Sequence, residues 1–263
     1  MKRNFLLITL LVLPLVSNSA EPETVSQFSF TEEQVQLASE IIAKLESNHL
    51  VKKEYQDIKE EAVEVFINRL DPNKNIFTSR EVDQFFVQSK KESNIKEDVN
   101  NAFNLFNKYV QRYHTRYEAQ IYFLNEITED SINSSRRINR DLSEGARLSS
   151  IEELRDLWKD LSTNDVIQLM LSGNSLTDAS HKTKKRMDNQ FNYFEQTRSD
   201  DVFNIFINSI ASVYGPHTNY MSPKNSEDFD INMSLSLEGI GALLSSDGLY
   251  TSISSLVPGG PAE

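Results

Sequence analysis

The sequence predicts a mainly α-helical protein whose C-terminal part is β-rich. From about residue 31 to residue 214, apolar side chains recur with the spacing that places them on one face of a helix. Capping sequences precede several of these segments, and their polar residues can satisfy the free N–H groups at a helix start. Beyond Gly215-Pro216 the helical spacing gives way to short alternating segments with glycine turns.

Residues 1–20 have the composition of a secretory signal peptide. Two cationic residues come first, an apolar run follows, and small residues then allow cleavage after Ser19 or Ala20. The apolar run is shorter than the ~20 residues of a membrane-spanning helix, so we expect cleavage and no transmembrane segment in the mature chain. The predicted location is the periplasm, either free or peripheral to the inner membrane.

The composition narrows the classes of chemistry and of partner. The chain has no cysteine, which excludes disulfides, thiolate nucleophiles and thiolate metal sites. Its formal net charge of −12 argues against nucleic acid as a partner, because nucleic-acid binding relies on Lys and Arg to neutralise phosphates.

Three helix starts are marked by the same local chemistry, the capping box. Thr31 and Thr78 each precede a Gln or Glu three residues later, and a hydrophobic pair spans each cap. Ser150 and Glu153 repeat the arrangement. We therefore predict that helices begin directly after these three residues.

Behind the caps, apolar stripes predict the core. The last helix, capped by Ser199 or Asp200, is expected to turn an aromatic and aliphatic face inward, and residues 126–149 are expected to form an exposed loop. Aromatic residues on the long preceding segment are more typical of core than of a ligand site. The predicted core positions are Leu37, Ala38, Ile41, Ile42, Leu45, Ile58, Ala62, Val65, Phe66, Ile67, Leu70, Val99, Phe103, Phe106, Val110, Tyr113, Tyr117, Ile121, Leu124, Leu154, Leu157, Trp158, Leu161, Phe203, Phe206, Ile207, Ile210 and Tyr214.

Changes in composition divide the mature chain into three parts. Residues 21–214 are the predicted helical domain, and residues 215–232, punctuated by Pro, Ser and Asn, are the predicted linker. Residues 233–263 contain one strand over 240–244 and a return strand over 249–256, joined by an Asp-Gly turn. Because an isolated hairpin is marginal in water, we expect the hairpin to be the beginning of a larger domain.

Two features that could suggest a metal site do not form a complete one. Asp71, Asn73 and Asn75 have the spacing of the first ligands of an EF-hand loop, but the positions that should hold Gly and Glu are apolar. The four histidines have no ligand-like spacing, and we expect His217 to be a hydrogen-bonded structural residue. The sequence predicts no metal and no cofactor.

Three segments near the C-terminal end resemble one protease family. They are Pro216-His217-Thr218 with Tyr220, Leu237-Glu238-Gly239-Ile240-Gly241, and Val257-Pro258-Gly259-Gly260-Pro261-Ala262. They make the chain similar to the carboxy-terminal processing proteases, in the tail-specific branch of bacterial periplasms. In that family the first segment closes a helical domain, the second opens a PDZ domain and the third leads into a PDZ helix. The resemblance implies that residues 233–263 are an incomplete PDZ domain.

The resemblance also implies a role for the glycine-containing loop. A PDZ domain captures a free C-terminal carboxylate with backbone N–H groups, and the bound tail adds a strand to a sheet edge. Here the loop would comprise Gly239, Ile240 and Gly241, with Leu237 and Leu243 beside the tail. The expected partners are proteins or peptides with exposed apolar C-termini. The resemblance also allows an adaptor protein as a partner.

No residue of this chain is assigned to catalysis. The family uses a serine nucleophile and a lysine base in a protease core beyond the PDZ domain, and nothing in residues 1–263 corresponds to that core. In addition, Gly215 stands where the family commonly has Asp. We expect the N-terminal fragment of an exported tail-specific serine endopeptidase, inactive by itself. The alternative is a noncatalytic periplasmic binding or adaptor protein with a helical domain.

Overall fold

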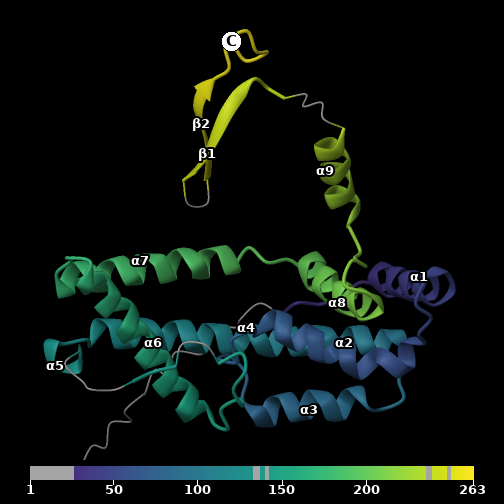
Figure 1. Cartoon of the computed structure of the whole chain (residues 1–263), viewed down its shortest axis with the longest axis horizontal. Helices are drawn as coiled ribbons and strands as arrows, with labels where there is room; N and C mark the ends of the chain where they lie inside the picture. The colour runs from purple at the N-terminus through teal and green to yellow at the C-terminus, as the bar shows by residue number, and fades with distance from the viewer. Residues whose placement is uncertain (1–26, 133–136, 140–141, 235–238, 248–249) are drawn as a thin grey trace, which may run out of the picture.

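The computed structural model describes residues 27–132, 137–139, 142–234, 239–247 and 250–263, so the predicted signal peptide lies outside it. The described chain is mainly helical, as the sequence predicts, and includes one two-stranded sheet. The elements are α1 (Glu32–Asn48), α2 (Tyr55–Leu70), α3 (Ser79–Ser89), α4 (Ile95–Asn125), α5 (Glu129–Ile132), α6 (Ile151–Leu171), α7 (Leu176–Phe194), α8 (Ser199–Tyr214), α9 (Pro223–Met233), β1 (Ala242–Asp247) and β2 (Tyr250–Leu256). Figure 1 shows α1 to α8 gathered in an elongated body, from which α9 leads toward the hairpin of β1 and β2.

The predicted capping boxes are present at the starts of α1, α3 and α6. At α1, the Thr31 hydroxyl accepts the N–H of Gln34 at 3.2 Å, and the Gln34 side chain accepts the N–H of Thr31 at 3.0 Å. The same exchange occurs at Thr78 and at Ser150. Each box satisfies two N–H groups that a helix start would otherwise leave without a partner.

The start of α8 differs from its prediction. The sequence indicates Ser199 or Asp200 as the cap, but Arg198 occupies that position, with φ −121° and ψ 163°. The Arg198 N–H donates to the carboxylate of Asp201 at 2.9 Å, so an acidic residue inside the first turn supplies the acceptor. Asp200 is engaged elsewhere, because it accepts a hydrogen bond from Gln34 of α1 at 3.0 Å.

The main hydrophobic core lies between α1, α2, α3, α8 and the N-terminal half of α4. Phe66 of α2 and Phe206 of α8 meet edge to face, with ring centroids 5.9 Å apart. Asn107 of α4 also fixes the chain ahead of α1, since it accepts the N–H of Phe28 at 2.8 Å and donates to its carbonyl at 2.9 Å. The apolar stripes predicted on these helices therefore do form one core.

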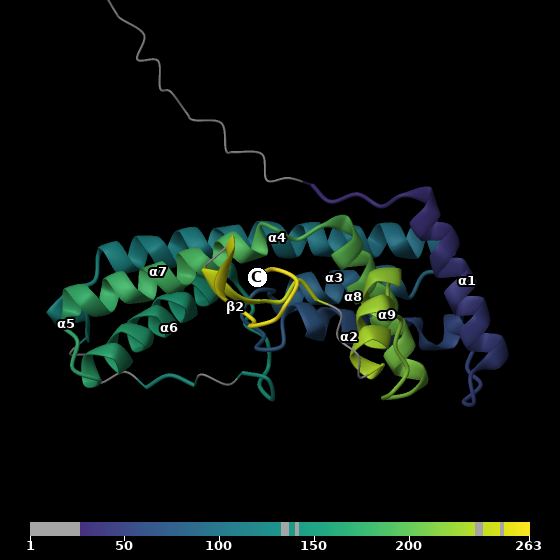
Figure 2. The same cartoon turned by 90° about the horizontal axis from the view of Figure 1, so that it is seen from above.

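A second apolar region lies where α6 and α7 pack on the C-terminal half of α4. Trp158 of α6 is fully buried, and its Nε1 donates to the carbonyl of Asn75 at 2.7 Å. Tyr117 of α4 stacks on Phe191 of α7 at 4.0 Å and donates to Asp188 at 2.8 Å. Burial, together with the Asp188 carboxylate, raises the pKa of Tyr117 to about 12. The long helix α4 thus runs through both regions and joins them (Figure 2).

Two segments predicted to lack helices contain short ones. α5 lies inside the predicted loop of residues 126–149, and α9 takes up much of the predicted linker of residues 215–232. At α9 the Ser222 hydroxyl accepts the N–H of Asn225 at 3.3 Å, and Pro223 occupies the first turn, where its missing N–H is not needed. The same Ser and Pro that suggest a linker thus begin a helix here.

The predicted hairpin is present with slightly different bounds. β1 and β2 pair antiparallel from Ala242 opposite Leu256 to Asp247 opposite Tyr250. The register shifts between Leu243 and Leu244, an irregularity of the kind that bends and twists a strand pair. The Asp-Gly turn lies partly outside the described residues.

Candidate functional site

The predicted tail-binding residues lie at the start of the hairpin. Gly239, Ile240 and Gly241 directly precede β1, and Leu243 is the second residue of that strand. Leu237 lies outside the described residues. Ile240 is 58% exposed and Leu243 is 59% exposed, so the packing of the described chain leaves most of both side chains open to solvent.

Gly241 is the position in this loop where the backbone requires glycine. Its φ is +70°, a region that L side chains rarely adopt. A Cβ atom there would lie 2.7 Å from Cδ of Pro261 and 2.9 Å from Cα of Gly260. The Gly241 carbonyl also accepts the N–H of Val257 at 2.7 Å. The two glycine-containing motifs found separately in the sequence therefore lie against each other. Gly239, by contrast, has no atom close to where its Cβ would be.

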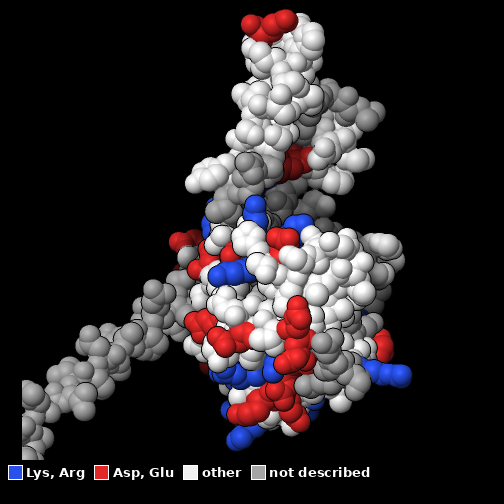
Figure 3. Space-filling model, turned by 90° about the vertical axis from the view of Figure 1, so that its left-hand side faces the viewer, with Lys and Arg blue, Asp and Glu red and all other residues white. Residues whose placement is uncertain are grey.

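The hairpin presents apolar side chains and unpaired strand edges. All residues of β2 are exposed, and Leu244 of β1 lies opposite Ile253 of β2, also exposed. Because the described sheet has two strands, each strand has one edge whose N–H and C=O groups lack a strand partner. Such an edge can accept an extended peptide as an added strand. Figure 3 shows few charged side chains in this part of the molecule, whereas acidic and basic groups are interspersed over the helical body.

A histidine joins the helical body to the segment that leads toward the hairpin, but it is His49 and not His217. Nδ1 of His49 lies 3.0 Å from both the nitrogen and the carbonyl oxygen of Val51, and its Nε2 forms a hydrogen bond with the Thr218 hydroxyl at 2.8 Å. A Cβ on Gly215 would lie 3.2 Å from that hydroxyl. His217 is exposed and has no hydrogen-bond partner among the described residues, so the prediction that it is a hydrogen-bonded structural residue is wrong.

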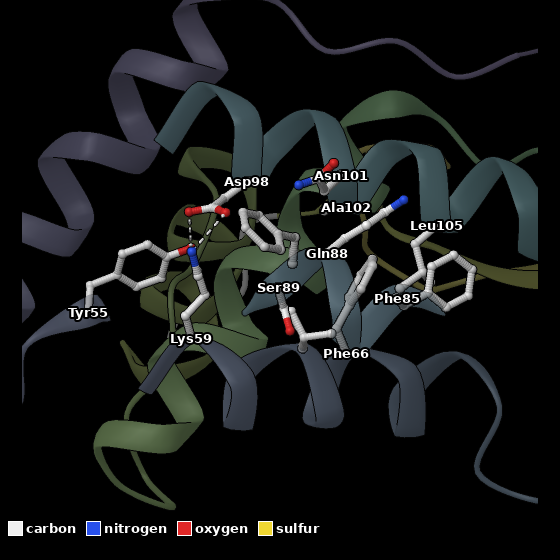
Figure 4. Close-up of a pocket in the computed structure, with 12 residues that line it drawn as sticks. Tyr55, Lys59, Phe66, Phe85, Gln88, Ser89, Asp98, Asn101, Ala102 and Leu105 are labelled. Atoms are coloured by element: carbon white, nitrogen blue, oxygen red, sulfur yellow. Dashed lines mark hydrogen bonds and ion pairs between the residues drawn. The ribbon is translucent and has the colours of Figure 1, made fainter. Parts of the chain in front are cut away.

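The structure also contains a buried polar cluster in which a lysine contacts a serine; Figure 4 draws three of its members, Tyr55, Lys59 and Asp98. Lys59 of α2 donates to the Ser93 hydroxyl at 2.7 Å, and the Ser93 hydroxyl donates to Asp98 of α4 at 2.6 Å. Tyr55 donates to the other oxygen of Asp98 at 3.1 Å. Burial and the Asp98 carboxylate both raise the pKa of the Tyr55 hydroxyl.

This cluster is not arranged for serine–lysine chemistry. A lysine that acts as a base must be free to take the serine proton, but the Lys59 Nζ is held by the Lys91 carbonyl at 2.8 Å and lies 3.7 Å from the carboxylate of Asp98. The adjoining cavity, of about 30 Å³, has room for water but not for a peptide side chain. The cluster therefore attaches the start of α4 to α2.

The partial EF-hand pattern at Asp71 has a structural explanation. The Asp71 carboxylate accepts the backbone N–H of Asn75 at 2.8 Å, of Ile76 at 3.2 Å and of Phe77 at 3.1 Å. It also pairs with Arg147. Its oxygens are thus used to fold the loop between α2 and α3.

Neither a metal cluster nor a membrane helix is found in the described residues. No group of three or more His, Asp or Glu side chains in this part of the chain could hold a metal ion. No described helix combines the length and the hydropathy needed to cross a bilayer.

Comparison with known proteins points to one family. The family described as "Tail specific protease N-terminal domain" matches residues 41–224, which run from α1 into α9. The chain is also 30% identical over 254 residues to the "Tail-specific protease" of Haemophilus influenzae. That similarity covers 94% of this chain and 36% of the relative, so the chain spans about a third of the relative's length.

Proposed function

Because the chain belongs to the tail-specific protease family through its N-terminal domain, we propose that it is the N-terminal part of an endopeptidase that selects proteins by their C-terminal tails. In this proposal the helical body helps to place substrates, and the hairpin takes part in holding the tail. The cluster of Lys59, Ser93 and Asp98 is not arranged for serine–lysine catalysis, and we expect no hydrolysis from this chain by itself.

The open hairpin is the observation that supports tail recognition most. A C-terminal tail needs backbone donors for its carboxylate, a strand edge for its backbone and an apolar surface for its side chains. The segment around Gly241 offers a glycine turn directly before an unpaired edge of β1. Ile240 and Leu243, both largely exposed, supply apolar surface beside that edge.

We further propose that the chain is exported to the periplasm. The charge, hydropathy and small-residue pattern of residues 1–20 supports this. Expression in a Gram-negative host, followed by fractionation and N-terminal sequencing, tests it. The expected product lies in the periplasmic fraction and begins at Ala20 or Glu21. A cytosolic product that retains Met1 would contradict export.

The central experiment measures binding of a labelled apolar peptide to purified residues 21–263 by fluorescence anisotropy. We expect weak binding that requires the free carboxylate, so that the C-terminally amidated peptide binds less tightly. No peptide cleavage is expected. Equal binding of the acid and the amide would contradict tail recognition. It would favour instead a noncatalytic binding role, which the self-contained core of the helical body would allow.

Gly241→Ala sharpens this experiment. The added Cβ would meet Pro261 and Gly260 at less than 3.0 Å, and the positive φ adds strain, so the loop must move. We expect carboxylate-dependent binding to be lost while the helical body stays folded. The matched control is Gly145→Ala, whose Cβ would make an ordinary 3.5 Å contact with the Leu142 carbonyl. Unchanged binding in Gly241→Ala would remove this loop from the site.

A further inference from the structure

A polar pocket lies where the two apolar regions of the helical body meet. Its lining includes Asn73 from the loop after α2, Arg116 and Gln120 from α4, Asp165 from α6, and Arg186 and Gln190 from α7. Its volume is about 320 Å³, within the range of small-molecule sites. The pocket thus brings side chains from four segments of the chain to one place.

Arg116 is the cation in this pocket that forms no direct ion pair with a carboxylate of the described residues. Its Nε donates to the Gln120 side-chain oxygen at 3.2 Å, and its Nη1 donates to the Asn75 side-chain oxygen at 3.0 Å. Both partners are neutral amides, and the two carboxylates that act on Arg116 electrostatically, Asp71 and Asp165, pair with Arg147 and Arg186. Burial lowers the pKa of Arg116, which reflects the cost of removing a cation from water. An anion in the pocket would offset that cost.

The neighbours of Arg116 hold its guanidinium in a fixed position. Gln120 donates to the Ser162 hydroxyl at 3.2 Å, and the backbone of Asn75 is bonded both to Asp71 and to Trp158. Arginine has five N–H donors, and the two bonds to amides leave three for a ligand. A planar fork of this kind matches the two oxygens of a carboxylate.

The charge of the lining indicates which anion fits. The second cation, Arg186, pairs with Asp165 at 2.7 Å, so two cations and one carboxylate leave a net charge of +1. A carboxylate with a single negative charge balances this, whereas a phosphate group, at about −1.5 to −2, exceeds it. The chain as a whole carries −12, which further disfavours multiply charged anions.

We propose that this pocket binds a monoanionic carboxylate through the Arg116 fork, with Asn73 and Gln190 as side-chain amide partners. Two sources share this chemistry, a small carboxylic acid and the C-terminus of a peptide. The pocket lies outside the hairpin, and its ligand binding does not depend on the role of Gly241 in tail recognition.

A titration followed by nuclear magnetic resonance tests the proposal. The probes are N-acetylglycine, an apolar pentapeptide with a free C-terminus, its C-terminal amide, and inorganic phosphate. N-acetylglycine or the free-acid peptide is expected to shift the Arg116 Nε–H resonance and the side-chain amide resonances of Gln120 and Asn75. Shifts with both probes, or with one alone, identify which source the pocket accepts. Absence of shifts with both, equal shifts with the amide, or tighter binding of phosphate would overturn the proposal.

Three variants separate binding from folding. Arg116→Gln is expected to weaken carboxylate binding on the order of ten- to a hundredfold, because a charge-assisted pair is lost. The matched control, Arg155→Gln, removes the same charge from an exposed position on α6 and should leave the affinity unchanged. Since Arg116→Gln also breaks internal hydrogen bonds, Gln190→Ala at an exposed lining position provides a second variant, with an expected loss of about threefold. Wild-type affinity in both pocket variants would also overturn the proposal.

Discussion

The helical body buries most of its large apolar side chains, whereas the hairpin leaves its apolar side chains exposed. In the helical body, large side chains such as Phe66, Trp158 and Ile207 are almost completely buried. In the hairpin, Leu244 and Ile253 face each other across the strands and both stay more than half exposed. The two regions therefore differ in how their apolar surface is covered.

This difference indicates which region contributes most to the free energy of unfolding of the described chain. Burial of apolar surface is the dominant favourable contribution to folding, and the helical body contains almost all of that burial. The hairpin is held by strand pairing and by the contact of Gly241 with residues 257–261. We therefore expect substitutions of equal size to have very different effects in the two regions.

The largest expected effect comes from the core of the helical body. Phe66→Ala removes a ring that is 1% exposed and packs on Phe206, so we expect a loss of about 3–5 kcal/mol in the free energy of unfolding. Ile253→Ala in the hairpin should change it by no more than about 0.5 kcal/mol. Urea unfolding monitored by far-UV circular dichroism measures both. Similar losses in the two variants would show that the hairpin is packed against something in solution.

The next effect concerns the polar contacts that fix the loops of the helical body. Asp71→Ala leaves Arg147 without its partner and removes the acceptor for three backbone N–H groups, so we expect a loss of about 3 kcal/mol. Asp83→Ala is the control, because Asp83 is an exposed acid on the nearby helix α3. Thermal unfolding compares the two. If both variants lose the same stability, the buried carboxylate is not what holds this loop.

A smaller effect should appear in the pH dependence of stability. Burial raises the pKa of Glu81, but hydrogen bonds from Arg112 and from Thr78 outweigh it, so the net pKa lies below its ordinary value of 4.5. A carboxyl group whose folded pKa is lowered stabilises the fold above its unfolded pKa. That contribution is lost as the pH falls through the folded pKa. The difference in unfolding free energy between wild type and Glu81→Gln should therefore become smaller as the pH is lowered from about 6 to about 3.

The control for this titration is Glu64→Gln, an exposed glutamate on α2 with no ion pair among the described residues. Its unfolding free energy should stay parallel to that of wild type across the same pH range. If the unfolding free energies of wild type and Glu81→Gln differ by the same amount at every pH, the charge of Glu81 does not stabilise the fold.

Those parts of the fold that depend on residues close together in the sequence could be predicted from the sequence. The capping boxes at Thr31, Thr78 and Ser150 require partners only three positions away, and the apolar stripes follow from the helical period. The start of α8 was the exception. There Asp200 bonds Gln34, which is 166 positions away in the sequence, and the local pattern carries no sign of it.

The polar sites depend on residues that no spacing rule connects. His49 meets Thr218 across 169 positions, and Arg116 meets Asn75 across 41. In the hairpin, glycine patterns did indicate the loop at Gly241, but not that Pro261 would lie against it. Sequence reasoning could therefore name the candidate tail-binding loop, whereas the polar pocket became visible only after α4, α6 and α7 were placed together.

The smallest expected effect follows from removing the hairpin altogether. A chain that ends at Ser234 keeps every buried residue of the helical body, and α9 itself buries none of its residues. Its free energy of unfolding should therefore stay within about 0.5 kcal/mol of that of the 263-residue chain. In the longer chain, hydrogen exchange of the hairpin amides should be fast compared with that of α2 and α8, because exposed backbone bonds open locally. A loss of more than about 1 kcal/mol on deletion, or slow exchange in β1 and β2, would show that the exposed apolar strands pack on the helical body, and the contrast between the two regions would not hold.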